Sequence, residues 1–160
     1  MNSISHIKRL LILLLMASSI LIYTPATYAE DHPVIQVYKS PTCGCCKAWV
    51  KYLEFSGFEV EVSNDMQEID ALRTLFKIAS NEKGCHTAVV DGYIIEGHVG
   101  AEEIRRLLAQ KPEIKGLAVP GMPNGSPGMT PINAEPYDTL ALRRDNTSYV
   151  FSTREAESPE

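Results

Sequence analysis

The sequence predicts an α/β fold in one small domain. Short β-branched segments alternate with amphipathic helical segments, and three cysteines stand between the first predicted strand and the first predicted helix. The chain has 160 residues, which is enough for one modest hydrophobic core. A strand followed by a helix and a second strand favours a sheet with a parallel pair.

The first strand and helix flank the cysteines. Residues 34–38, Val-Ile-Gln-Val-Tyr, predict a strand, and the Ser-Pro-Thr sequence at 40–42 interrupts it. From residue 45 to residue 55 the apolar residues recur at spacings of three and four, which predicts a helix ended by Ser56 and Gly57. The cysteines should therefore lie at a helix N-terminus.

The middle of the chain continues this alternation. Residues 58–62 alternate apolar with acidic residues and predict a second strand, parallel to the first. Asp65 and Glu68 form a capping box, which predicts a helix to about residue 79. The expected buried stripe of this helix consists of Ile69, Leu72, Leu75, Phe76 and Ala79.

A hairpin and a third helix follow. Residues 87–90 and 93–96 read as two strands, because the Asp91-Gly92 sequence between them suits a tight type I′ turn. Residues 101–109 predict the next helix. The resulting order, β-α-β-α-β-β-α with thiols after the first strand, is the thioredoxin-like arrangement, and we expect a three-layer sandwich.

The C-terminal part adds a loop and a hairpin to this core. Residues 119–131 are rich in glycine and proline and predict an ordered loop or lid. Residues 140–142 and 149–151 predict a final hairpin, and residues 152–160 a disordered tail. We expect the folded domain to span residues 30–151, with its core in residues 33–130.

Residues 1–29 have the pattern of a secretory signal peptide. Lys8 and Arg9 precede an apolar run from Leu10 to Ile22, and small residues lead up to Ala29. The run is shorter than the roughly 20 residues of a membrane-spanning helix, so we expect an exported protein without membrane contact after cleavage. The net charge of −5 disfavours nucleic acid as a partner, whereas a metal ion remains compatible.

The cysteines carry the expected chemistry. Cys43 and Cys46 have the C-x-x-C spacing of thiol-disulfide enzymes, and a helix N-terminus stabilises a thiolate there. Such an enzyme has no evident use for the third thiol of Cys45, whereas a soft cation does. Copper is therefore the leading expectation, with zinc as the weaker alternative.

Residues further along the chain extend the predicted site. Cys85 and His86 precede a strand, where thioredoxin-like proteins carry a cis-proline facing the C-x-x-C motif. The expected metal ligands are Cys43, Cys45, Cys46, Cys85 and His86. A disulfide with one of the first three cysteines is the alternative for Cys85.

Three residues near this site have weaker signals. We expect His98 to be a hydrogen-bonded residue beside the ligands, not one of them. Met122 and Met129, in the glycine-proline loop, could bind Cu(I) or pin the loop onto the core.

Four segments together resemble the CopG-type periplasmic copper-resistance proteins, which are also catalogued as an uncharacterised metal-binding domain. The segments are residues 37–49, 85–88, 96–99 and 121–129. The resemblance implies a thioredoxin-like fold, a periplasmic location and copper bound by Cys43, Cys45, Cys46 and Cys85. It also suggests a role in cycling copper between Cu(I) and Cu(II), and copper carriers or exporters as partners.

Three functional hypotheses follow. The first is a periplasmic copper-binding protein for copper resistance, which sequesters copper or processes its oxidation state. The second is a thiol-disulfide oxidoreductase with Cys43 as nucleophile and Cys46 as resolving thiol. The third is an inert domain stapled by two disulfides, which binds a protein through the glycine-proline loop.

Overall fold

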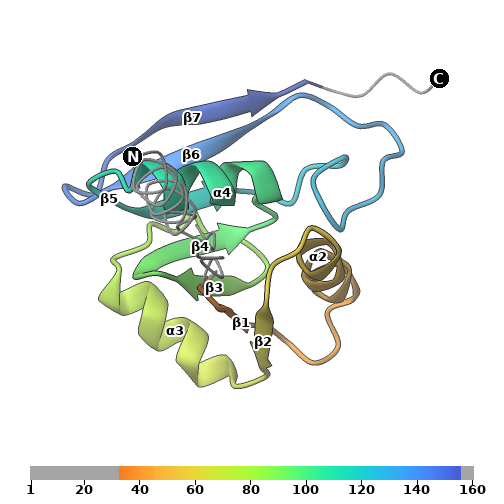
Figure 1. The fold of residues 1–160 in the computed structure, drawn as a ribbon, viewed down its shortest axis with the longest axis horizontal. Helices are drawn as coiled ribbons and strands as arrows, with labels where there is room; N and C mark the ends of the chain where they lie inside the picture. The colour runs from red at the N-terminus through yellow and green to blue at the C-terminus, as the bar shows by residue number, and fades with distance from the viewer. Residues whose placement is uncertain (1–32, 156–160) are drawn as a thin grey trace, which may run out of the picture. The chain divides into compact units, whose positions relative to one another are not determined.

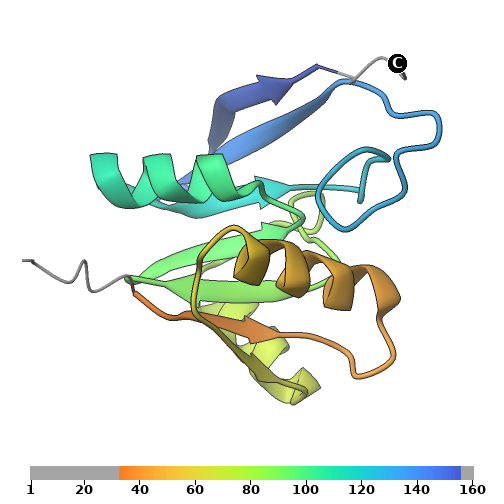
Figure 2. The same ribbon diagram turned by 45° about the vertical axis from the view of Figure 1, so that its right-hand side comes forward.

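The computed structural model describes residues 33–155, in which seven strands form one mixed sheet (Figure 1). The strand order is β2-β1-β3-β4-β5-β6-β7. In chain order the elements are β1 (Ile35–Tyr38), α2 (Gly44–Phe55), β2 (Val60–Ser63), α3 (Met66–Leu75), β3 (Thr87–Val90), β4 (Tyr93–Gly97), α4 (Ala101–Gln110), β5 (Ile114–Val119), β6 (Tyr137–Arg143) and β7 (Ser148–Arg154). Figures 1 and 2 show β2 at one end of the sheet and the β6–β7 hairpin at the other.

The first half of the sheet has the predicted thioredoxin-like topology. β1 pairs parallel with β2 and antiparallel with β3, and β3 pairs antiparallel with β4. The β3–β4 hairpin turns at Asp91 and Gly92, whose φ angles of 47° and 80° suit a type I′ turn. The expected order β-α-β-α-β-β-α is therefore confirmed from β1 through α4.

Helices cover both faces of the strands, which gives the expected three layers. α2 and α4 share one core cluster, with Trp49 and Leu53 from α2 and Ile104 and Leu107 from α4. On the other face, Leu72 of α3 joins a smaller cluster. Figure 1 shows α3 across the β1–β3–β4 strands from α4. Neighbouring strand residues alternate between these faces, as the pleat requires.

The expected end of the second predicted helix is wrong. α3 ends at Leu75, not near residue 79, because Phe76 caps it and Lys77 has a φ angle of 52°. Leu75, which we placed in the buried stripe, has 73% of its surface exposed. The prediction failed because apolar residues continue at helical spacing after Leu75, where the backbone is no longer helical.

Strand β5 was not predicted. It pairs parallel with β4 and antiparallel with β6, so it connects the thioredoxin-like strands to the terminal hairpin. Its short sequence contains Gly116, which lowers strand propensity. A Cβ atom at that position would overlap the backbone of Ile94 on β4. The glycine that obscured the strand is therefore the residue that its packing needs.

The C-terminal hairpin is confirmed, but it is longer than predicted. β7 continues to Arg154, so residues 152–154 belong to the sheet and not to a disordered tail. Residues 156–160 and the predicted signal peptide lie outside the described residues.

Gly116→Ala should lower the free energy of unfolding by about 1–3 kcal/mol, because the added methyl group forces β5 away from β4. Gly44→Ala is the matched control, since a Cβ there meets no atom within 4 Å. Urea unfolding followed by circular dichroism measures both. Equal unfolding midpoints for the two variants would contradict the close β4–β5 packing.

Candidate metal centre

The first turn of α2 holds three of the four cysteines. Cys43 is the N-cap residue, and its Sγ accepts a hydrogen bond from the backbone N–H of Cys46 at 3.3 Å. Cys45 and Cys46 are the second and third residues of the helix. The positive end of the helix dipole therefore faces the sulfur of Cys43, which favours its thiolate form when it is reduced.

Strand pairing brings the fourth cysteine to the same place. Tyr38 at the end of β1 pairs with Thr87 at the start of β3. The chain leaving β1 towards Cys43 and the chain entering β3 from Cys85 therefore lie at one edge of the sheet. This register brings Cys85 close to Cys43, although the two residues are far apart in the sequence.

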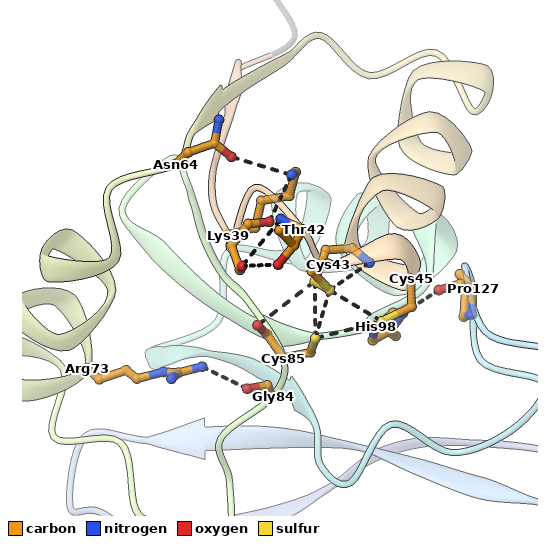
Figure 3. The surroundings of a disulfide bond; sticks show 12 residues. Lys39, Thr42, Cys43, Cys45, Asn64, Arg73, Gly84, Cys85, His98 and Pro127 are labelled. Atoms are coloured by element: carbon orange, nitrogen blue, oxygen red, sulfur yellow. Dashed lines mark hydrogen bonds between the residues drawn. A yellow bond between two sulfur atoms is a disulfide. The ribbon is translucent and has the colours of Figure 1, made fainter.

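The four sulfurs form one cluster, which we call the sulfur cluster (Cys43, Cys45, Cys46 and Cys85). They all lie within 4.8 Å of one another. A disulfide joins Cys43 to Cys46, and Cys45 and Cys85 are free (Figure 3). The Cys85 Sγ lies 3.1 Å from the sulfurs of both Cys43 and Cys46, and 3.7 Å from that of Cys45.

Burial divides the sulfur cluster into an inner and an outer part. Cys46 is fully buried, whereas the other three cysteines are half-buried. Burial raises the pKa of Cys85 to about 11, and the neighbouring Cys45 adds to the effect, while Arg73 acts in the opposite direction. Cys85 is therefore a protonated thiol at neutral pH, and a bound cation would have to displace its proton.

His86 is not part of the group of four side chains whose ligand atoms lie within 4.8 Å of one another, so its role as a fifth ligand stays a prediction. Its ring is fully buried, with centroids 4.3 Å from the Trp49 ring and 5.1 Å from the His98 ring. Burial, followed by His98, lowers the pKa of His86 to about 3, so the ring is neutral. Neither ring nitrogen has a hydrogen-bond partner of normal geometry. His86 directly precedes β3, and its ring packs between those of Trp49 and His98.

His98 connects the core to the glycine-proline loop. Its Nδ1 lies 2.6 Å from the carbonyl oxygen of Pro127, so Nδ1 carries the proton and donates it (Figure 3). This confirms the expected hydrogen-bonded role. A Cβ on the neighbouring Gly128 would lie 2.6 Å from the backbone nitrogen of Trp49 and 2.8 Å from the carbonyl oxygen of Cys45. The loop therefore rests directly on the first turns of α2.

The two loop methionines differ in exposure. Met129 is half-buried, whereas Met122 has 41% of its surface exposed. The loop is held by His98 and Gly128, so Met122 is not needed to pin it onto the core. A sulfur-ligand role for either methionine stays a prediction.

Two residues beside Cys85 were missed by the sequence analysis. Glu96 of β4 is fully buried and pairs with Arg73 of α3 at 2.9 Å. Glu96 also accepts hydrogen bonds from Gly84 and Thr87, on either side of Cys85. The sequence signal that could have pointed to Glu96 is an acidic residue directly after Ile94 and Ile95 in a predicted strand.

Chemically, this arrangement can do two things. Polarizable sulfurs at these separations are the donors that soft cations prefer, once the disulfide has been reduced. A disulfide next to free thiols can also exchange with other thiols. The expected inert domain with two disulfides does not match the described residues, where Cys45 and Cys85 are unpaired.

Comparisons with known proteins agree with this picture. Residues 82–129 match the family described as "Protein of unknown function, DUF411". The chain is 35% identical over 72 residues to the uncharacterized glutaredoxin-like 8.6 kDa protein in the rubredoxin operon of Clostridium pasteurianum. That match covers 43% of this chain and 91% of the relative. Among residues 33–155, no helix has the length and apolar character needed to cross a membrane.

Two solved structures resemble the chain over most of its length. They are the copper resistance protein CopG in form 1 and in form 2, with TM-scores of 0.72 and 0.70. Each is 35% identical to this chain, and each match covers 78% of this chain and 99% of the solved one. With this identity across a whole solved chain, and the same α/β fold, the protein belongs to the CopG copper-resistance family.

Proposed function

We propose that the protein binds copper through the thiolates of Cys43, Cys45, Cys46 and Cys85, and that it serves copper resistance by sequestering copper or changing its oxidation state. The observation that carries this proposal is the placement of four sulfurs within 4.8 Å of one another. Two solved structures of CopG, which is named for copper resistance, share the fold, and this supports copper over other soft cations.

We favour copper over zinc because zinc sites generally take two separated pairs of ligands, whereas three of these four sulfurs come from one C-x-C-C segment. Thiolates bind Cu(I) strongly, and crowded thiolates can bridge several Cu(I) ions. Zinc would use the four sulfurs as a closed tetrahedral site. Direct competition between the two metals therefore separates the copper site from the zinc alternative.

The disulfide couples copper binding to redox chemistry. Reduction of the Cys43–Cys46 bond takes up two electrons and releases two thiolates for the metal. In the reverse direction, oxidation of these thiolates to the disulfide releases two electrons, which would reduce two Cu(II) ions to Cu(I). The same sulfurs thus serve binding and electron transfer.

The place of action in this proposal is the periplasm. The basis is the signal-peptide pattern of residues 1–29, together with the family resemblance. Copper carriers or exporters in that compartment would deliver or receive the metal.

A thiol-disulfide oxidoreductase is the second candidate function. A disulfide between Cys43 and Cys46, with Cys43 at a helix N-terminus, favours it. The glutaredoxin-like relative adds support. In this function Cys43 would attack the substrate and Cys46 would resolve the mixed disulfide.

Reduced protein loaded anaerobically with Cu(I) should retain copper and become resistant to alkylation at all four cysteines, because the sulfurs are occupied by the metal. Metal analysis after gel filtration, with a thiol count by mass spectrometry, measures both. An equal challenge with Zn²⁺ is the control. Protein that retains no copper, or prefers zinc, contradicts the proposal.

Cys45→Ser should lower the amount of copper bound and leave thiol-disulfide exchange by Cys43 and Cys46 intact, because only the metal needs the third sulfur. Copper analysis and an insulin-reduction assay separate the two functions. Cys46→Ser is the paired variant and should lose both. Unchanged copper loading in Cys45→Ser would sink the assigned role of the third thiol.

The affinity for Cu(I) should rise from about pH 6 to about pH 8, because protons compete with copper for the Cys85 sulfur, whose pKa lies near 11. Titration against a chromophoric Cu(I) chelator at several pH values measures the slope. Cys85→Ser should give a shallower slope. The same slope in the variant and the unmodified protein would exclude Cys85 as a ligand.

A further inference from the structure

A buried ion pair between Arg73 and Glu96 lies beside Cys85, on the face of the sheet that α3 covers. Arg73 belongs to α3, whereas three of the four cysteines lie at the N-terminus of α2 on the other face. The guanidinium of Arg73 donates to both carboxylate oxygens of Glu96, from Nε at 3.1 Å and from Nη2 at 2.9 Å. The Glu96 side chain is fully buried, and that of Arg73 has 15% of its surface exposed. Both charges are therefore satisfied within the protein.

This pair is connected to the chain on both sides of Cys85. The Gly84 N–H donates to Glu96 Oε2 at 3.0 Å. The Gly84 carbonyl accepts from Arg73 Nη2 at 2.8 Å, as Figure 3 shows. On the other side, Thr87 Oγ1 donates to Glu96 Oε1 at 2.6 Å. Residues on both sides of Cys85 therefore donate hydrogen bonds to the same carboxylate, that of Glu96.

Close backbone packing restricts the same segment further. The Gly97 N–H donates to the His86 carbonyl at 3.0 Å, and a Cβ on Gly84 would overlap Gly97. Residues 84–87 therefore lie tightly against the end of β4. Hydrogen bonds and close backbone packing together hold this turn.

Stability alone does not explain a charged pair at this position. Burying two charges costs free energy that their attraction roughly offsets, so well-packed apolar residues stabilise as well or better. The benefit of the pair is geometric, because a bidentate guanidinium and a carboxylate with several donors fix directions as well as distances. The segment that these contacts hold, residues 84–87, contains Cys85, whose sulfur lies 3.1 Å from two others.

We propose that Glu96 and Arg73 are positioning residues, which hold Cys85 in place so that its sulfur completes the sulfur cluster. For copper affinity this inference rests on the proposed function. The inference about the position of the Cys85 thiol does not rest on the proposed function, because that position can be tested without metal.

The metal-free test uses the oxidised protein, in which Cys45 and Cys85 are the free thiols among the described residues. Dibromobimane becomes fluorescent when it joins two neighbouring thiols. Glu96→Gln keeps the shape of the side chain but loses its charge, and we expect cross-linking of Cys45 to Cys85 to slow by about tenfold or more. Glu103→Gln is the matched control, because it breaks the Arg154–Glu103 pair elsewhere in the fold. That variant should lose some stability and cross-link at the unmodified rate.

The copper test repeats the comparison on reduced protein. Loss of such a supporting contact typically weakens metal binding by about 10- to 100-fold, and we expect this for Glu96→Gln and not for Glu103→Gln. If cross-linking is slow in Glu96→Gln but the unmodified protein binds no copper, the positioning role stands and the copper function is overturned. Cross-linking of folded Glu96→Gln at the unmodified rate would overturn the positioning role.

Thr87→Val provides a milder variant in case Glu96→Gln fails to fold. It removes one hydrogen bond to Glu96 and leaves the ion pair with Arg73. We expect slower cross-linking with a circular dichroism spectrum like that of the unmodified protein. An unchanged cross-linking rate in this variant would count equally against the proposal.

Discussion

The antiparallel pairing of β1 with β3 determines where the sulfurs lie. Tyr38 is opposite Thr87, so the end of one strand and the start of the other meet at the same edge. α2 begins directly beyond that edge and presents three cysteines in its first turn. A shift of one residue in the pairing would turn every side chain of β3 to the other face and remove Cys85 from the site. The placement of the four sulfurs is thus a consequence of strand register.

Binding of a metal and formation of the disulfide draw on the same atoms. Cys43 and Cys46 share a bond in this structure, and the remaining two thiols lie beside it. A cation gains its full donor set only after two electrons arrive, while the proton on Cys85 presents a second requirement. Redox state and proton concentration therefore act together on the four sulfurs. Three of them are half-buried, which leaves a route for ions or partner thiols.

Local patterns in the sequence predicted the elements that position the cysteines, because those elements have strong periodicity and clear turn residues. The same patterns failed where tertiary contacts decide the outcome. α3 ends early through the backbone conformation at Lys77, and β5 depends on a close approach of Gly116 to Ile94. His86 is next to a site residue in sequence, and its buried ring packs on Trp49. Adjacency to Cys85 could not reveal the direction of that ring.

The least predictable part of the site is its support from α3. Arg73 and Glu96 are far apart in sequence, and each has an ordinary explanation as a charged surface residue until the fold is known. Their pairing links the two faces of the sheet, since one face supplies three sulfurs and the other supplies the charges beside the fourth. A site assembled from such distant segments exists only in the folded chain, so a bound metal stabilises the fold by the free energy of its binding. Folding and copper binding would then depend on the same few contacts around Cys85.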